Sequence, residues 1–182
     1  MIKSRLDLKE YLTEDAKANH RKTVRAKIFG DEIWKYILAL RKTEYYKNSR
    51  KRIAYYLEKI KLHKLSIKLG FQIPINVCER GLSLPHFGTV VIASEAKIGK
   101  YCRIHEGVTI GATNGSSKAA TVGDRVFIGT GAKIIGEVSV ADDCAIAANS
   151  VVVSSIEQAS TTWGGVPAKK ISDNGSDLNL HY

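Results

Sequence analysis

His86 is the residue of this sequence best suited to chemistry, because its type and its position both favour catalysis. It lies in the segment Pro85-His86-Phe87-Gly88, where an otherwise regular pattern of aliphatic residues is interrupted. An imidazole exchanges protons near neutral pH and can therefore serve as a general base. A histidine held by hydrogen bonds in a turn is the alternative. The interruption favours catalysis, since irregular segments of a regular scaffold often carry function.

A second polar pair, His105 and Glu106, follows downstream. His105 comes directly after a residue of the regular pattern, which favours a structural role for it. The remaining histidines are interpreted as surface residues; they are His20, His63 and His181.

The elements that must position these residues follow a repeat of six between Ile92 and Ile156. An α-helix repeats near 3.6 residues and an isolated strand at about 2, so a period of six fits neither. The repeat predicts a mainly β solenoid, a hexapeptide-repeat parallel β-helix in which short strands stack coil upon coil. The first aliphatic column comprises Ile92, Ile98, Ile104, Ile110, Val122, Ile128, Ile134, Val140, Ile146 and Val152. The second column, four residues later, comprises Ala96, Cys102, Val108, Val126, Ala132, Val138, Cys144, Ser150 and Ile156.

Counting three sides of six residues per coil predicts which residues stack. One side begins at Leu84, Ile104, Ile128 and Ile146, and the next begins at Ile92, Ile110, Ile134 and Val152. His86 then lies on the side that carries His105 and Glu106 one coil later.

Two faults interrupt the repeat. The step from Leu84 to Ile92 is eight residues instead of six, so a bulge containing His86 is expected there. The segment GATNGSSKAAT, residues 111–121, fills two periods and is predicted to be a loop leaving the end of the same side. We expect the bulged histidine and this loop to share one cleft.

Helical patterns precede the repeats, which divides the chain into a helical region at 1–72, a β-helix at 73–171 and a polar tail at 172–182. One helix is predicted to begin at Asp31-Glu32, and another to run from Ser49 to Leu69 with Gly70 as its stop. The second is basic, with an apolar stripe of Ile53, Tyr56, Leu57, Ile60 and Ile67. We expect this stripe to pack on the coil or on a neighbouring subunit, because the end of a β-helix is an open apolar surface. A peripheral contact with an anionic membrane is the alternative.

Composition indicates an ordinary soluble, cytoplasmic protein of 182 residues, with 44% hydrophobic and 25% charged residues. No apolar run approaches the ~18 residues of a spanning helix, and the N-terminus lacks the apolar run of a signal peptide. Residues 1–70 hold 19 Lys/Arg against 8 Asp/Glu, a balance of +11, whereas the rest of the chain balances at −1. Nucleic-acid binding is not favoured, because charge is present without a recognisable binding module.

Cys102 and Cys144 are expected to pack inward as small residues.

From Ile73 to Ile171 the chain resembles the hexapeptide-repeat acyltransferases, and among them the serine acetyltransferases. The resemblance rests on the repeats and on two motifs, Gly81-Leu82-Ser83-Leu84-Pro85-His86 and Gly165-Val166-Pro167-Ala168-Lys169. It implies a left-handed β-helix that forms homotrimers, with each active site between neighbouring subunits. It also implies acetyl-CoA as the acetyl donor, and no metal.

By position, the resemblance makes His86 the general base that takes the proton of the acceptor hydroxyl. The positions that it assigns to contacts with coenzyme A are Gly111, Ala112 and Thr113 in the loop, Thr130, Gly131 and Ala148 at the pantetheine arm, and Pro167, Lys169 and Lys170 near a phosphate.

Two departures from the family pattern concern the acceptor. Pro85 stands where the family has an acidic partner of the base, and Glu106 is the residue that could orient the imidazole instead. Ala119 stands where the family's loop has a histidine that helps to hold the amino acid. Serine is the expected acceptor, and a sugar hydroxyl of an envelope or capsular polysaccharide is the alternative.

Two other classes of function were weighed. A zinc-dependent hydratase on this fold would need three histidines, and the repeats supply too few. A scaffold that only presents the basic helices to a partner would not depend on His86.

Overall fold

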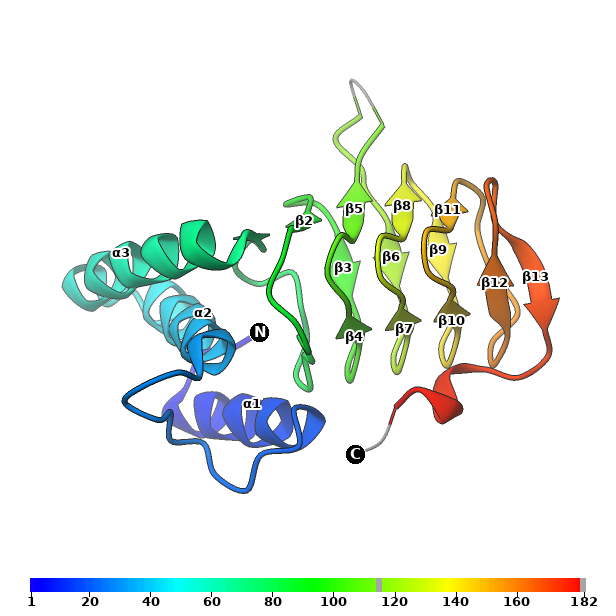
Figure 1. The fold of residues 1–182 in the computed structure, drawn as a ribbon. Helices are drawn as coiled ribbons and strands as arrows, with labels where there is room; N and C mark the ends of the chain where they lie inside the picture. Colours follow the sequence, from blue (N-terminus) through cyan, green and yellow to red (C-terminus); the bar gives the residue numbers. More distant parts are fainter. Residues whose placement is uncertain (114–115, 181–182) are drawn as a thin grey trace.

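The structure is a computed structural model that describes residues 1–113 and 116–180. Three helices come first: α1 (Arg5–Ala18), α2 (Glu32–Asn48) and α3 (Arg52–Leu69). They lie at one end of a stack of short strands (Figure 1). The strands are β1 (Phe71–Gln72), β2 (Val90–Ile92), β3 (Lys97–Ile98), β4 (Arg103–Ile104), β5 (Thr109–Gly111), β6 (Thr121–Val122), β7 (Phe127–Ile128), β8 (Lys133–Ile135), β9 (Ser139–Val140), β10 (Ala145–Ile146), β11 (Val151–Val152), β12 (Thr162–Gly164) and β13 (Lys169–Ser172).

The strands form three sheets that the chain visits in turn, so that three successive strands make one coil. The sheets have the orders β1-β2-β5-β8-β11, β3-β6-β9 and β13-β12-β10-β7-β4, and every pairing is parallel except β12 with β13. Register places Ile104 opposite Ile128 and Ile92 opposite Ile110, as the count of six predicts. A parallel bridge between Ser83 and Arg103 extends the first of these alignments back to the coil that carries His86.

Both columns of the repeat face the interior of the coil. All residues of both columns are buried, with the aliphatic column at 3% exposure or less. Cys102 and Cys144 pack inward as predicted, and Cys78 is buried too. Burial raises the pKa of the Cys102 thiol to about 12, so this sulfur stays protonated and acts as a small apolar group.

Local chemistry accounts for the helix ends. Ser4 and Asp7 form a capping box at the start of α1, where each side chain bonds the backbone of the other. Gly70 ends α3 in the left-handed conformation, with φ of 78°, as the sequence predicts. The chain then enters β1 at Phe71, so the first strand begins just before the predicted boundary at residue 73.

A buried ion-pair network joins the helices to the first turn of the coil. Arg41 and Asp15 are fully buried, and the Arg41 Nε lies 2.7 Å from an Asp15 carboxylate oxygen. Asp15 also accepts hydrogen bonds from the backbone amides of Gly81 and Leu82, at 2.7 and 2.9 Å. These contacts fix the segment that leads into the bulge at His86.

The apolar stripe of α3 does not pack on the coil of its own chain, so this part of the expectation is wrong, and packing on a neighbouring subunit stays a prediction. Ile53, Leu57 and Ile67 are 80%, 65% and 71% exposed, whereas the opposite face of the helix buries Leu62 and Leu69. Because α2 contacts α3 through that opposite face, the stripe is left on the surface. No helix in the described part of the chain is long and apolar enough to cross a membrane.

The polar tail returns to the coil. Lys169–Ser172 pairs with β12 as strand β13, and a short 3₁₀ helix follows at Ser176–Leu178. Ser176 is buried, and its hydroxyl donates to the carbonyl of Arg125. The tail is therefore tied down through Ser176.

Candidate active site

The bulge that carries His86 is fixed between α3 and the next coil. The Gly88 amide donates to the Leu69 carbonyl at 3.0 Å, and the Val90 amide donates to the Gly70 carbonyl at 3.1 Å. Gly88 has a φ of 139°, and a Cβ at this position would lie 2.9 Å from the Cβ of Glu106. Glycine is therefore required where the bulge rests on the side chain of Glu106. The exposed His86 is held directly above that contact.

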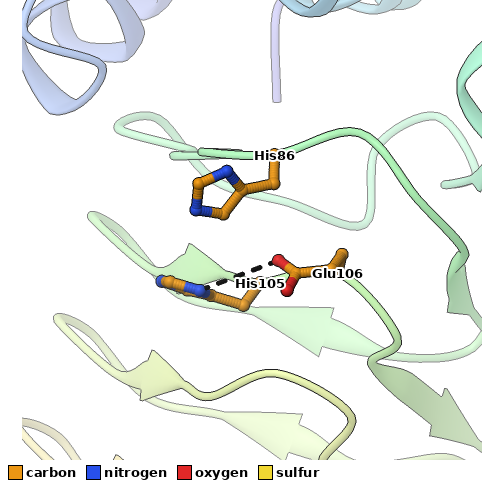
Figure 2. Close-up of side chains that lie close together, drawn as sticks. All are labelled: His86, His105 and Glu106. Atoms are coloured by element: carbon orange, nitrogen blue, oxygen red, sulfur yellow. Dashed lines mark ion pairs between the residues drawn. The ribbon is translucent and has the colours of Figure 1, made fainter.

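His86, His105 and Glu106 meet at this corner of the coil, as Figure 2 shows. The rings of His86 and His105 lie edge to face, with centroids 5.5 Å apart. An oxygen of Glu106 lies 3.9 Å from the Nδ1 of His105. One ligand-type atom from each of the three residues lies within 4.8 Å of the other two. The cluster combines a solvent-accessible imidazole with a carboxylate one coil away.

Glu106 keeps its negative charge in this setting. Hydrogen bonds from its own backbone amide and from the Thr130 hydroxyl, the latter at 3.0 Å, hold the pKa of the Glu106 carboxyl below its usual value. Its second oxygen, Oε2, is buried and accepts no hydrogen bond from the described residues. The predicted neighbourhood of Glu106 and His86 is present, but the closer ring nitrogen belongs to His105.

His105 is held neutral at the same corner. Burial, and then the positive charge of Arg103, lower the pKa of the His105 imidazole below 6.5. The Arg103 Nε–H donates to the Nε2 of His105 at 3.4 Å, which leaves Nδ1 facing Glu106. The Phe127 ring packs against the other side, with centroids 5.0 Å apart. Sequence reasoning gave His105 a structural role because it follows the aliphatic column, although the count of sides places it on the same side as His86, one coil later.

The predicted coenzyme A contacts fall on two corners of the coil. Thr130, Gly131 and Ala148 stack below Glu106, where the Gly131 amide donates to the Glu106 carbonyl at 2.9 Å. The Asn149 amide donates to the Thr130 carbonyl at 2.8 Å and continues the stack. At the far end, Pro167 and Lys169 are exposed, and Lys170 forms an ion pair with Asp173 at 2.5 Å.

Gly111, Ala112 and Thr113 lie at a different corner. Strand β5 runs from the corner of Glu106 to the corner at which the loop leaves, where the Gly136 amide donates to the Gly111 carbonyl at 2.9 Å. The expectation that His86 and the loop share one cleft is therefore wrong for the single chain, because a whole strand separates them. Residues 114–115 of the loop lie outside the described residues.

A cavity of about 350 Å³ adjoins His86 on the side of the helices. It is lined by residues from three distant parts of the sequence, among them Arg21, Trp34, Ser83 and Arg103. Sequence reasoning did not identify this cavity. No pattern links the segment between α1 and α2 to the coil, and only the folded arrangement brings Arg21 beside Ser83.

Comparisons with known proteins agree with this fold. The chain is 35% identical over 130 residues to the serine acetyltransferase of Helicobacter pylori (strain ATCC 700392 / 26695), covering 69% of this chain and 70% of the relative. It is 30% identical over 154 residues to the serine acetyltransferase of Staphylococcus xylosus, covering 82% and 67% of the two chains. No family model matches.

Solved structures give the same result. A serine acetyltransferase in complex with cysteine superposes with a TM-score of 0.71 at 26% identity, over 92% of this chain and 71% of that one. The serine acetyltransferase of Brucella abortus strain S19 gives 0.66 at 29% identity, over 93% and 71%.

The stacked parallel strands, with a histidine exposed at one corner, together with these relatives define the chain as an acyltransferase. More narrowly, it belongs to the serine acetyltransferase family.

Proposed function

We propose that this protein transfers the acetyl group of acetyl-CoA to the hydroxyl of L-serine. The observation that carries the proposal is the exposed imidazole of His86, held over the ionised Glu106 on a member of this family. Solved relatives include a serine acetyltransferase in complex with CoA and one in complex with serine. The comparisons lend no support to a polysaccharide acceptor.

In this mechanism His86 takes the proton of the serine hydroxyl while the oxygen attacks the thioester carbonyl. The C–S bond then breaks, and the imidazolium returns its proton to the departing thiolate. A carboxylate oxygen of Glu106 lies within 4.8 Å of a ring nitrogen of His86, which supports a role for its negative charge in stabilising the imidazolium. Serine becomes O-acetylserine, and free coenzyme A leaves.

We propose a left-handed coil that assembles as a homotrimer. The separation of the two sets of coenzyme A positions supports this assembly. Thr130 and Ala148 lie on the corner of His86, whereas Ala112 and Thr113 lie at the other end of β5. A cofactor that touches both sets needs the loop corner of one copy to face the histidine corner of the next. Lys169, exposed at the end of the coil, is then available to a phosphate of coenzyme A.

The exposed stripe of α3 is proposed to meet a second copy of the chain. Its large apolar side chains face outward on one side of the helix, and an area of this kind is rarely left uncovered. The flanking lysines and arginines would also suit an anionic bilayer. Binding to anionic vesicles distinguishes a membrane contact from a contact with a second copy.

A metal is not required by this proposal, although His86, His105 and Glu106 are residue types that bind metals. The guanidinium of Arg103 beside His105 disfavours a cation there, because like charges repel in a poorly hydrated site. Treatment with a chelator is expected to leave turnover unchanged, as measured by thiol release.

The decisive experiment measures thiol release from acetyl-CoA with L-serine, homoserine and a panel of sugars. We expect turnover with serine, and a loss of about 10²- to 10⁴-fold for His86→Gln, the range for a lost general base. His63→Gln is the matched control, because His63 is exposed on α3 away from the cluster. Absence of turnover on every acceptor would refute the enzyme, and turnover on sugars alone would refute serine.

A further inference from the structure

We propose that the cavity beside His86 binds the carboxylate of the acceptor amino acid, with Arg103, Ser83 and Arg21 as its binding groups. The inference rests on the proposed acetyl transfer to serine and names the residues that select the acceptor. These three side chains all line the cavity of about 350 Å³ that adjoins the base.

Arg103 supplies the positive charge that would bind the carboxylate. Its Nε–H is engaged with His105, but its two terminal nitrogens form no hydrogen bond or ion pair with any residue in ranges 1–113 and 116–180. An arginine side chain presents its N–H groups in a planar fork that matches a carboxylate, and buried or half-buried guanidinium groups normally have such a partner. Arg103 is half-buried in the wall of the cavity and offers that fork to a ligand.

Two buried polar atoms point to the same conclusion independently. Ser83 is only 1% exposed, and its hydroxyl has no hydrogen-bond partner among the described residues. The Nε–H of Arg21 is also buried without a partner in that part of the chain. Native proteins leave few buried polar groups unpaired. Two such groups lining one cavity, both able to donate, indicate a ligand that brings acceptor oxygens.

The charge of the cavity fits one negative group. The terminal nitrogens of Arg21 lie 2.6 and 2.8 Å from the two carboxylate oxygens of Asp31, so these charges compensate each other. The backbone amide of Lys27 also donates to Asp31, at 2.9 Å. Arg103 therefore remains as the one full positive charge without a compensating carboxylate among the described residues lining the cavity. A single carboxylate matches it better than the several charges of a nucleotide phosphate.

The position of the cavity also fits the acceptor. In serine only two carbon atoms separate the hydroxyl oxygen from the carboxyl carbon, so a site for the carboxylate must lie next to the base. Pro85 and His86 form part of the wall of the same cavity as Arg103, so the base adjoins the space that Arg103 lines. The ring of Trp34, with the Arg21 guanidinium stacked over it at 4.8 Å, also lines the cavity.

The test measures binding and turnover with the full-length chain and its variants Arg103→Gln, Arg103→Lys and Ser83→Ala. L-serine and L-serinamide are compared, because the amide lacks the carboxylate but keeps the hydroxyl. For the wild type we expect serine to bind about 10- to 100-fold more tightly than serinamide, which corresponds to one charge-assisted contact. Arg103→Gln should abolish most of this preference and leave the KM for acetyl-CoA unchanged. Arg103→Lys should restore part of it.

Ser83→Ala separates binding from folding. Removing a buried hydroxyl that has no partner should leave the unfolding temperature unchanged or raise it, while the affinity for serine falls. Arg52→Gln, an exposed arginine of α3, is the control that should change neither quantity.

Each possible result either supports or overturns carboxylate binding in the cavity. Equal losses for serine and serinamide in Arg103→Gln would overturn the inference, and so would a raised KM for acetyl-CoA, which would assign Arg103 to a phosphate. Calorimetry with serine in the absence of acetyl-CoA reports on the cavity alone. Serine binding that depends on Arg103, without turnover, would therefore support carboxylate binding in the cavity and refute acetyl transfer. Turnover of serine that does not change in Arg103→Gln would support acetyl transfer and refute carboxylate binding by Arg103.

Discussion

The imidazole rings of His86 and His105 meet edge to face with centroids 5.5 Å apart, although they come from successive coils. Only His105 is pressed between other groups, with Arg103 on one side and Phe127 on the other. The exposed ring of His86 is thus open to a substrate, while the half-buried ring of His105 packs against it. The two histidines should respond differently to substitution.

His105 should make the fold sensitive to mild acid. Its pKa is lowered by burial and by Arg103, so the unfolded chain takes up the proton at a higher pH than the folded chain does. Stability is therefore lost as the pH falls from about 6.5 through the lower pKa of the folded state. His105→Gln should flatten this part of the profile, measured as unfolding temperature against pH. His63→Gln should retain it, and an unchanged slope in His105→Gln would contradict the assigned cause.

Glu106 should affect the rate more than substrate binding. Glu106→Gln keeps the shape of the side chain and its hydrogen bond with Thr130, but it removes the charge that faces both histidines. We expect kcat to fall roughly 10- to 100-fold with little change in either KM, because the charge is needed when the imidazolium forms. Glu95→Gln, an exposed residue, is the control. A raised KM for serine with an unchanged kcat would instead make Glu106 an acceptor-binding residue.

Lys169 and Lys170 should differ in their importance for acetyl-CoA. Both were predicted to meet a phosphate, but Lys170 already bonds Asp173 at 2.5 Å and Gln158 at 3.1 Å. Lys169 forms no ion pair with the described residues and is exposed. Lys169→Gln should therefore raise the KM for acetyl-CoA by about 3- to 10-fold, the typical contribution of one exposed charge contact. Lys170→Gln should raise the KM for acetyl-CoA by less. The measurement is the KM at low and high salt, and the reverse order would contradict the assignment.

The exposed stripe of α3 yields a comparison between neighbouring leucines. Leu57 is 65% exposed and Leu62 is 8% exposed on the same helix. If a second copy covers the stripe, Leu57→Ser should give a smaller assembly in sedimentation, whereas Lys61→Ser should not. Leu62→Ser should instead destabilise the chain itself by about 2–4 kcal/mol through the lost core contact. An unchanged mass with lost binding to anionic vesicles would favour the membrane contact.

The sequence predicted the coil in detail, because its repeat depends on local stacking. The alignments of Ile104 with Ile128 and of Ile110 with Ile134 follow from counting alone, and both occur. The bulge at His86 was located by the same count. These features need no knowledge of distant contacts, since each side chain packs on its counterpart one coil away.

What the sequence could not predict depends on contacts between remote segments. Arg21 and Ser83 line one cavity although more than sixty positions separate them in the sequence, and no periodicity relates them. The exposed stripe of α3 could not be told from a buried one, because an apolar face looks the same whether it meets α2, another subunit or a membrane. The cleft predicted between His86 and the loop does not form within one chain, because β5 separates the two corners.

The strongest effect on stability is expected at Arg41, which holds the helices against the coil. Its side chain is fully buried, pairs with Asp15 at 2.7 Å and with Glu44 at 3.1 Å, and donates to the carbonyls of Cys78 and Glu79. Arg41→Met would leave two buried carboxylates without their cation. The free energy of unfolding should fall by about 3–5 kcal/mol, as is usual when one partner of a buried pair is removed.

The matched control for Arg41 is an ion pair on the surface. Lys17 lies 2.8 Å from Glu14 but is 60% exposed, so Lys17→Met should cost less than about 1 kcal/mol. Urea unfolding followed by tryptophan fluorescence measures both, since Trp34 reports on the helices and Trp163 on the coil. Neutralising the orphaned acids with Asp15→Asn and Glu44→Gln should recover part of the loss in Arg41→Met. Equal costs for Arg41→Met and Lys17→Met would show that the buried network does not dock the helices.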